Sequence, residues 1–262
     1  MQNEIVVDIQ KFQKSFGTRV IHRSVDLQIK RGECLGLLGG SGAGKSVILR
    51  SMIGLEKPDS GKIIVDKVDI TQLNERDLIP VRKKIAYVFQ GGALFDSMSV
   101  FDNLAYPLRE HTQLNPSEIS ERILKLLKTF GLEGSEQLLP ANLSGGMQKR
   151  VGLARAIILE PEVVLYDEPT AGLDPYNTKR IQEMILKLKS QGVTSMLVTH
   201  DMPTAFAVCD RIALLLDGSI YAVLPTKQLA ETYGLDSDNS NGENQAVAQF
   251  ARMTLFINGD EA

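Results

Sequence analysis

The sequence predicts an α/β fold built around a parallel core sheet, and three observations support this prediction. Short apolar runs, such as residues 34–38 and 163–166, alternate with segments whose apolar residues recur at helical spacing. A glycine-rich loop joins the first of these runs to a helical segment. The second run ends in two adjacent carboxylates, Asp167 and Glu168. Strands that alternate with helices in this way are typical of a parallel sheet.

The glycine-rich loop reads Gly-Gly-Ser-Gly-Ala-Gly-Lys-Ser and fits the pattern of phosphate-binding loops. Its glycines let successive N–H groups face an anion, and the following helix adds the partial positive charge of its N-terminus. We expect Lys45 to reach the β- and γ-phosphates of a nucleotide and the Ser46 hydroxyl to bind Mg²⁺. The alternative, a glycine-rich turn that ends in Lys-Ser by chance, is disfavoured by the strand before the loop and the helix after it. The expected nucleotide contacts are Gly39, Gly40, Ser41, Gly42, Ala43, Gly44, Lys45, Ser46 and Val47.

Composition narrows the function classes. The chain has 262 residues, of which 43% are hydrophobic and 23% charged, as in an ordinary globular protein. Its formal net charge of −3 argues against nucleic acid as a partner, because nucleic-acid binding needs a basic face. The sequence contains no apolar run of about 18 residues and no signal peptide, so we expect a cytosolic protein unless a partner holds it at a membrane. Cys34 and Cys209 match no metal spacing and are expected to be buried free thiols in a reducing compartment.

The remaining elements follow from periodicity. Residues 5–12 and 25–29 alternate as short antiparallel strands of a β-subdomain beside the core. Further strands are expected at 62–65, 84–89, 163–166, 195–198 and 212–216, the last with a hairpin partner at 220–223.

Helices are expected at 47–53, at 100–108 with a break at Pro107, from Asn115 to about Phe130, at 144–159 and at 178–190. Residues 236–244 are too polar to order themselves and predict a flexible linker. The tail at 246–253 is either a short helix that docks on a partner or a frayed terminus.

Two further motifs indicate nucleotide chemistry. In a phosphate-loop enzyme, the strand-end Asp167 holds Mg²⁺ and the next carboxylate, Glu168, orients and deprotonates the attacking water. Alone, Asp-Glu after an apolar strand would fit any strand end. Ser144-Gly145-Gly146 at a helix start forms a second anion cradle. Its alternatives are a plain helix cap with spare glycines or a cradle for the γ-phosphate of a nucleotide held by a second copy.

With these motifs in place, the chain resembles the ATP-binding subunits of ATP-binding cassette (ABC) transporters from about residue 5 to residue 223. Residues 143–146 match the family signature, although Met147 replaces the usual Gln after it. The other matches are Gln90 at the Q-loop, residues 171–174 with Asp174 at the D-loop, His200 at the switch histidine and Phe16 at the adenine-stacking aromatic. Phe16 replaces the commoner Tyr, and the alternative for it is an ordinary core position. The alternative for His200 is a surface histidine whose hydrogen bonds are satisfied.

The resemblance implies a P-loop NTPase fold with a parallel core sheet, an N-terminal antiparallel β-subdomain and a helical subdomain at about 91–160. The ATPase domain would span residues 1–235, and a flexible linker and C-terminal tail would follow at 236–262. It also implies that two copies meet head to tail, with each ATP between Gly39–Ser46 of one chain and Ser144–Gly146 of the other. His200 would contact the γ-phosphate, and Gln90 would sense Mg²⁺ and water. The implied Mg²⁺ ligands are Ser46, Gln90 and Asp167.

The segment at 91–112 is where members of the family receive a helix of the membrane subunit. Leu94, Phe95 and Met98 are suited to an apolar socket, and ordinary packing of a helical subdomain is the alternative. The chain resembles the ATPases of Mla/Mce-type lipid transporters in the sequence of this segment, in the signature and in the tail residues Val247, Gln249 and Phe250. That resemblance implies a permease, a lipid-binding MCE-domain protein and a STAS-domain subunit as partners. It also implies phospholipid transport at the cytoplasmic face of the inner membrane, in support of outer-membrane lipid asymmetry.

Other functions are open on the motifs alone. The ATPase of a polar amino-acid importer has the same ATP motifs, and a non-transport ABC protein is a further alternative. A DNA-maintenance ABC ATPase is disfavoured, because the chain has no long heptad region and its net charge is acidic. A P-loop GTPase or a small-molecule kinase would need a base-reading Asn-Lys-x-Asp or a substrate lid, and neither is found.

Overall fold

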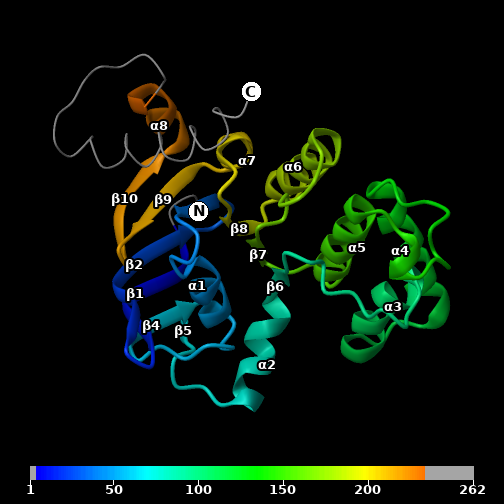
Figure 1. The fold of residues 1–262 in the computed structure, drawn as a ribbon. Coiled ribbons are helices and arrows are strands. Elements are labelled where there is room, and N and C mark those ends of the chain that lie inside the picture. The colour runs from blue at the N-terminus through cyan, green and yellow to red at the C-terminus, as the bar shows by residue number, and fades with distance from the viewer. Residues whose placement is uncertain (1–3, 234–262) are drawn as a thin grey trace.

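The computed structural model describes residues 4–233, which form a sheet flanked by helices and a helical lobe beside it (Figure 1). The strands are β1 (Ile5–Phe16), β2 (Arg19–Lys30), β3 (Cys34–Gly39), β4 (Ser60–Val65), β5 (Val68–Asp69), β6 (Ile85–Val88), β7 (Val163–Asp167), β8 (Thr194–Val198), β9 (Arg211–Leu216) and β10 (Ser219–Pro225). The helices are α1 (Lys45–Met52), α2 (Glu75–Lys84), α3 (Val100–His111), α4 (Pro116–Thr129), α5 (Gly145–Ile157), α6 (Pro175–Ser190), α7 (Met202–Val208) and α8 (Thr226–Tyr233), with a 3₁₀ turn, η1, at Pro140–Asn142. Within residues 4–233, no helix is both long and apolar enough to cross a membrane.

The strands lie in one sheet of order β5-β4-β1-β2-β10-β9-β3-β8-β7-β6. Strands β9, β3, β8, β7 and β6 run parallel to one another. Strands β5, β4, β1 and β2 are antiparallel, and the pair Ser219–Ser24 joins β10 to them. The predicted fold class, a parallel core with an N-terminal antiparallel subdomain, is therefore confirmed.

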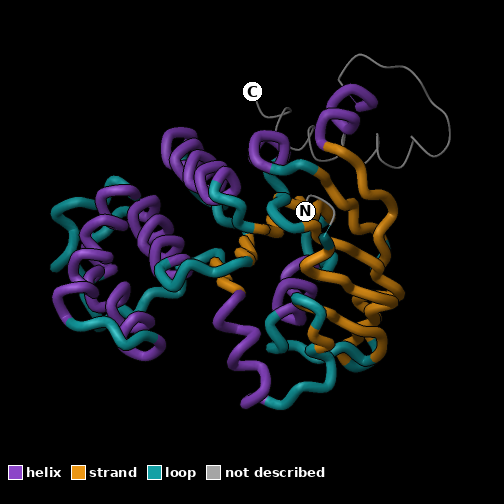
Figure 2. Tube along the Cα trace, turned by 180° about the vertical axis from the view of Figure 1, so that it is seen from behind, coloured by secondary structure: helices purple, strands orange, loops and turns teal. Residues whose placement is uncertain are grey.

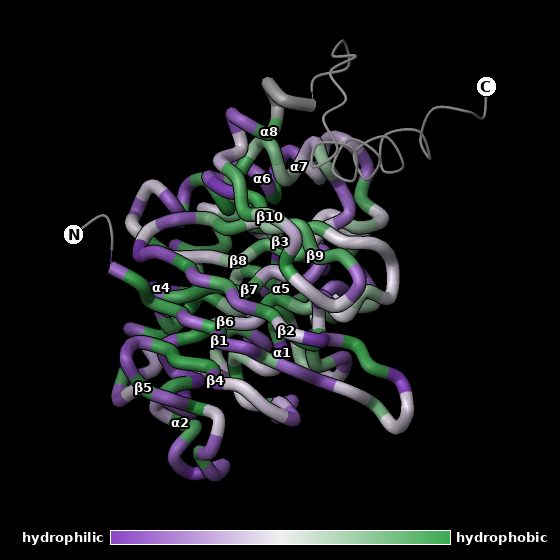
Figure 3. The backbone as a smooth tube through the Cα atoms, turned by 90° about the vertical axis from the view of Figure 1, so that its left-hand side faces the viewer, coloured by the Kyte–Doolittle hydropathy of each residue, from purple (hydrophilic) through white to green (hydrophobic). Residues whose placement is uncertain are grey.

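Both faces of the parallel core are covered by helices, as Figure 2 shows from behind. Alternate residues of one strand belong to different apolar clusters: Val163 and Leu165 face α1 and α2, whereas Val164 and Tyr166 face α5 and α6. Because neither face meets solvent, the central strands are mostly apolar on both faces, and much of the hydropathy-coloured tube in this region is green (Figure 3). The short continuous apolar runs in the sequence have this cause.

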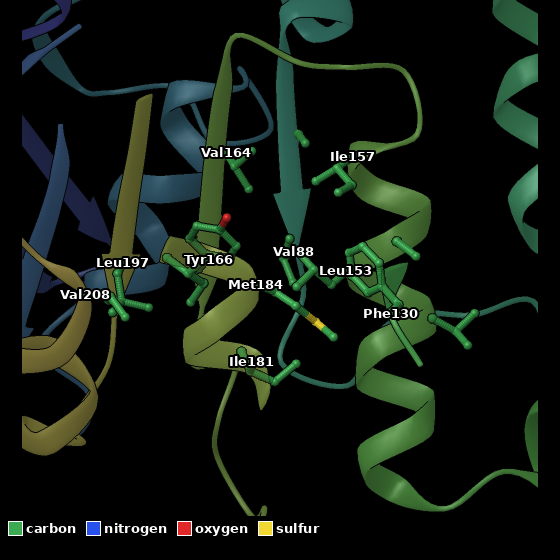
Figure 4. Packing of buried hydrophobic residues seen from close by; sticks show 14 of the residues in the cluster. Val88, Phe130, Leu153, Ile157, Val164, Tyr166, Ile181, Met184, Leu197 and Val208 are labelled. Atoms are coloured by element: carbon green, nitrogen blue, oxygen red, sulfur yellow. The ribbon is translucent and has the colours of Figure 1, made fainter. Parts of the chain in front are cut away.

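The helices α3, α4 and α5 lie together in a lobe beside the β6 edge of the sheet (Figure 1). Helix α4 begins as predicted, with Asn115 and Glu118 forming a reciprocal capping box and Pro116 in the first turn. The lobe attaches to the sheet through a packed layer in which Val88 of β6, Leu153 of α5 and Met184 of α6 lie near one another (Figure 4). This layer fixes where α5 stands relative to the strands.

Some elements differ from the prediction. The expected helix break at Pro107 is wrong, because α3 continues to His111. Proline removes one hydrogen bond to the carbonyl of residue 103, but Leu104 and Leu108 are fully buried and hold the helix against the lobe. Helix α6 starts earlier than expected, at Pro175, because the Asp174 side chain accepts a hydrogen bond from the Asn177 N–H at 2.9 Å.

Helices α2, α7 and α8 were not anticipated, and the predicted linker and tail beyond residue 235 lie outside the described residues. Cys34 and Cys209 are buried free thiols, as predicted. Their Sγ atoms lie 3.8 Å apart, because the segment after α7 passes beside the start of β3. The residues are 175 positions apart in the chain, so the sequence does not reveal this contact.

His22 of β2 supplies a prediction about the pH dependence of stability. Its side chain is 1% exposed, Nε2 lies 3.2 Å from the Gly44 carbonyl, and Nδ1 has no partner among the described residues. Burial lowers the pKa of His22 below its usual value of about 6.5, against the smaller opposing effect of the Gly44 carbonyl. Since the unfolded chain takes up this proton at higher pH than the folded one, stability is unaffected above about pH 6.5 and falls as the pH drops below it.

We therefore expect His22→Phe, which keeps a ring beside Phe12 without a titratable group, to flatten the fall in melting temperature between about pH 6.5 and pH 5. Thermal melts of both proteins across this range measure the difference. Equal slopes in the two proteins would assign the acid sensitivity to other groups.

Candidate functional site

Four parallel strands end at one edge of the core sheet, and most of the predicted site residues follow them directly. Asp167 of β7 and Leu37 of β3 both pair with Val198, the last residue of β8, so β7 and β8 end together and β3 runs two residues farther, to Gly39. Val88 of β6 lies beside Tyr166 in the same register. The segments that leave this edge carry the phosphate-binding loop after β3, Gln90 after β6, Glu168 after β7 and His200 after β8.

The phosphate-binding loop curls through two glycines in the left-handed region, Gly42 at φ 74° and Gly44 at φ 90°. A Cβ on Gly44 would lie 2.4 Å from Cγ2 of Ile21, so no larger residue fits there. Lys45 is 8% exposed, and its Nζ donates to the carbonyls of Gly39 at 2.8 Å and Gly40 at 3.0 Å. Burial lowers the pKa of Lys45, with Glu168 and Asp167 opposing the shift. The ammonium group is thus held at the base of the loop.

Asp167 is held by two hydroxyl donors. Its Oδ1 accepts a hydrogen bond from Ser46 Oγ at 2.8 Å, and its Oδ2 accepts one from the Tyr87 hydroxyl at 2.7 Å. Burial raises the pKa of Tyr87, and the Asp167 carboxylate raises it further, so this hydroxyl stays protonated as a donor. Sequence reasoning missed Tyr87, which lies on β6 one strand away from Asp167.

Glu168 stands in strained backbone at φ 49°, and its N–H donates to the carbonyl of Val198 at 2.9 Å. Its Oε2 lies 3.0 Å from Nδ1 of His200 and 3.3 Å from the N–H of the same residue. The carboxylate is half-buried and the imidazole is exposed. Strain at one non-glycine residue therefore directs Glu168 out of β7 and toward the end of β8.

A cavity of about 480 Å³ opens above these groups, a volume typical of ligand sites. Phe16 is 46% exposed on its wall, so the alternative that Phe16 is a core residue is wrong. Arg19, Ile21, Arg50 and Val198 also line the cavity and were missed by the sequence analysis, because no motif marks them. The predicted residues that line it are Phe16, Ser41, Gly42, Ala43, Gly44, Lys45, Ser46, Val47, Gln90, Glu168 and His200.

Ser144, Gly145, Gly146 and Asp174 do not line this cavity. Ser144 caps α5 by accepting a hydrogen bond from the Met147 N–H at 3.3 Å. Gly146 packs on the Asn177 side chain, which Asp174 binds in turn, and a Cβ on Gly146 would lie 2.5 Å from Asn177. Ser144, Gly145 and Asp174 are exposed. Gly39, Gly40 and Asp167 do not line the cavity either, but they bind the lining residues Lys45 and Ser46. The predicted site residues thus fall into two groups, one at or next to the cavity and one on the adjacent helix N-termini.

The expected Mg²⁺ requires oxygen donors at the site. Among residues 4–233, no group of three or more His, Cys, Asp or Glu side chains forms a metal cage. Mg²⁺ bound to nucleotides needs no such cage, since it takes one or two protein oxygens and completes its shell with phosphate and water. The Ser46 hydroxyl and the Asp167 carboxylate, 2.8 Å apart, are oxygen donors of this kind. The residues present therefore fit the ion.

Known proteins are similar to this chain in both sequence and fold. A family model described as ABC transporter matches residues 22–171. Mkl of Mycobacterium leprae, a probable ribonucleotide transport ATP-binding protein, is 42% identical over 212 residues, covering 80% of this chain and 61% of its own length. This chain therefore spans about three fifths of that relative. MlaF of Haemophilus influenzae, the ATP-binding protein of an intermembrane phospholipid transport system, is 37% identical over 234 residues, or 89% of each chain.

Among solved structures, the ATP-binding cassette MJ0796 in a dimeric post-hydrolysis state with ADP and Pi gives a TM-score of 0.78 at 32% identity, covering 84% of this chain and 98% of its own. The family match includes the phosphate-binding loop, the signature at α5 and the carboxylates after β7. With this match and two relatives above 30% identity, the chain belongs to the ABC transporter family as an ATP-binding member.

Proposed function

We propose that this chain hydrolyses ATP as the motor subunit of an ABC transporter that moves phospholipid between membranes. The observation that carries the ATPase assignment is the gathering of three groups: Lys45 and Glu168 line the cavity, and Asp167 binds the lining residue Ser46 and interacts electrostatically with Lys45. Phosphoryl transfer to water depends on positioning and charge neutralisation more than on covalent chemistry. An ammonium group, oxygen donors for a metal and a carboxylate beside the phosphate loop supply these requirements.

Each side chain has a role in this proposal. Lys45 and the loop N–H groups bind the β- and γ-phosphates, and Phe16 stacks on the adenine. Glu168 orients the attacking water and accepts its proton, and His200, 3.0 Å from that carboxylate, contacts the γ-phosphate. Gln90 extends toward the water and the metal from the end of β6. When bound through Ser46, Asp167 and Gln90, Mg²⁺ supplies positive charge to the phosphates.

The second group of residues, Ser144, Gly145, Gly146 and Asp174, acts on a nucleotide held by a second copy of the chain. Ser144, Gly145 and Asp174 are exposed, and none of the four residues lines the cavity, which supports this arrangement. The N-terminus of α5 presents free N–H groups to an anion, and Ser144 already caps it. The relative MJ0796, with ADP and Pi, has been solved as a dimer. ATP then joins two copies, and hydrolysis releases them.

The proposed cargo is a phospholipid, because a relative named as an intermembrane phospholipid transport ATP-binding protein matches over 89% of the chain. The name of Mkl, a probable ribonucleotide transport protein, makes a nucleotide the competing cargo. The partners we propose are a permease, a lipid-binding MCE-domain protein and a STAS-domain subunit, with the ATPase at the cytoplasmic face of the inner membrane. These follow from the resemblance of the chain to Mla/Mce-type ATPases.

The permease contact is proposed at the segment after Gln90. Phe95 and Tyr106 are each 43% exposed there, and their rings meet edge to face at 5.3 Å. Leu94 and Met98 beside them are half-buried. Exposed aromatic side chains beside aliphatic ones suit an apolar helix of a membrane subunit.

Replacing Glu168 by Gln removes the proposed base and keeps the shape of the side chain. We expect ATP hydrolysis to fall by about a hundredfold or more, while ATP still binds and the dimer accumulates. Phosphate release and size-exclusion chromatography with ATP measure both effects. Glu183→Gln, an exposed change on α6, is the matched control. Full turnover in Glu168→Gln would remove Glu168 from the mechanism.

Tyr87→Phe tests the support of the metal ligand. It deletes the 2.7 Å hydrogen bond to Asp167 Oδ2 and leaves Ser46 in place. We expect the Mg²⁺ concentration for half-maximal ATPase activity to rise by about tenfold, as is common when a group that orients a ligand is lost. Tyr221→Phe on β10 is the control. An unchanged Mg²⁺ requirement would make Tyr87 a packing residue.

The cargo and partners are tested by a tagged pull-down from detergent-solubilised native membranes, with proteins and bound lipids identified by mass spectrometry. A permease, an MCE-domain protein and phospholipid are the expected result. A permease with a solute-binding protein and no lipid would keep the ABC ATPase and assign it a polar solute. Capture of no membrane protein would contradict the transport role.

A further inference from the structure

A second polar cluster lies in the helical lobe, outside the nucleotide cavity. Its centre is Asn103 of α3, which is 0% exposed. Asn103 Oδ1 accepts a hydrogen bond from the Phe95 N–H at 2.9 Å. Its Nδ2 lies 3.1 Å from the Phe95 carbonyl, 3.1 Å from that of Met98 and 3.0 Å from that of Ser99. One buried amide thus fixes the backbone of residues 95–99 by both of its polar atoms.

Arg155 of α5 extends this cluster. Its Nη1 donates to Asn103 Oδ1 at 3.3 Å, its Nη2 donates to the Ala93 carbonyl at 2.5 Å, and its Cζ lies 5.1 Å from the Phe95 ring centroid. Arg155 is half-buried, and among residues 4–233 no carboxylate forms an ion pair with it. A half-buried charge without a counter-ion is costly, so this guanidinium depends on the segment that it holds.

The same segment also touches α5 directly. Gly92 and Gly152 are in close contact, since a Cβ on Gly152 would lie 2.7 Å from Cα of Gly92. Residues 92–99 therefore attach to α5 at two of its positions, Gly152 and Arg155. The N-terminus of that helix is Gly145, after the cap Ser144. A helix of 13 residues moves as a rigid rod, so a shift of the segment reaches Ser144.

We propose that Asn103 and Arg155 are positioning residues that join the permease-facing segment 93–99 to the Ser144–Gly146 end of α5. The inference rests on the proposed permease contact at Phe95 and Tyr106. Permease movement at Phe95 carries α5 with it and places Ser144 against the nucleotide of the second copy. Neither Asn103 nor Arg155 lines the nucleotide cavity, so their effect is on the stimulation of hydrolysis by the permease.

The test compares ATP hydrolysis by the isolated ATPase and by its complex with the co-purified permease in lipid nanodiscs. Arg155→Met removes both hydrogen bonds and keeps an unbranched side chain of similar length. We expect the complex to assemble, basal hydrolysis to stay within about twofold of wild type, and stimulation by the permease to fall by about fivefold to tenfold. Arg122→Met is the matched control, because it makes the same change in the same lobe at a surface pair with Glu160.

A second measurement covers a change in folding. Arg155→Lys keeps the charge but lacks the planar fork, and a smaller loss of stimulation with an unchanged melting temperature is expected. In wild type, permease binding should slow hydrogen exchange at residues 93–99 and at 144–148 together, whereas in Arg155→Met only residues 93–99 should be protected.

Three results would overturn the inference. Wild-type stimulation in Arg155→Met excludes a coupling role for Arg155. If neither Arg155 variant binds the permease, the Asn103–Arg155 cluster serves to bind the permease, and a coupling role is excluded. A wild-type protein that captures no permease removes the proposed function, and the inference falls with it.

Discussion

The site depends on the register in which β3, β7 and β8 pair, because this register brings their carboxyl ends to one edge of the sheet. Because Leu37 and Asp167 both pair with Val198, the phosphate loop, the carboxylates and His200 leave the sheet at one edge. The hydrogen bond from Ser46 to Asp167 at 2.8 Å then joins α1 to β7. A slip in this register by one residue would turn Asp167 to the other face of the sheet. The strand register that buries the apolar side chains of the sheet is therefore also the register that places Asp167 at the site.

Much of the fold could be predicted from the sequence, because its signals are local. The parallel strands contain short apolar runs, the phosphate loop has its glycine spacing, and α4 has its capping box. What local signals do not contain is contact between distant segments. The Tyr87 hydrogen bond to Asp167, the Sγ contact of Cys34 with Cys209 and the path of α3 through Pro107 all depend on tertiary packing. The sequence motifs identify the site residues, but their hydrogen-bond partners from distant segments, such as Tyr87 for Asp167, are seen only in the folded structure.

The two groups of predicted site residues differ in how they are held. Around the cavity, Lys45, Asp167 and Glu168 are bound to other parts of the same chain and are at least half-buried. Ser144 and Asp174 are exposed, and each binds only the first turn of its own helix in the contacts described above. A rigid half and an exposed half suit the proposed site between two copies, in which the exposed half approaches and leaves a nucleotide with each cycle.

In the proposed complex, the position of α5 lets the permease control that approach. Its N-terminus carries Ser144, its middle touches Gly92, and its Arg155 binds Ala93 and Asn103. Lys149 of the same helix donates to the Ala171 carbonyl in the loop after Glu168. One helix therefore carries the signature at its N-terminus, contacts the loop after Glu168 through Lys149, and contacts the segment proposed to face the permease through Gly152 and Arg155. Because it is a single rigid element, a displacement imposed at any of these contacts changes the other two.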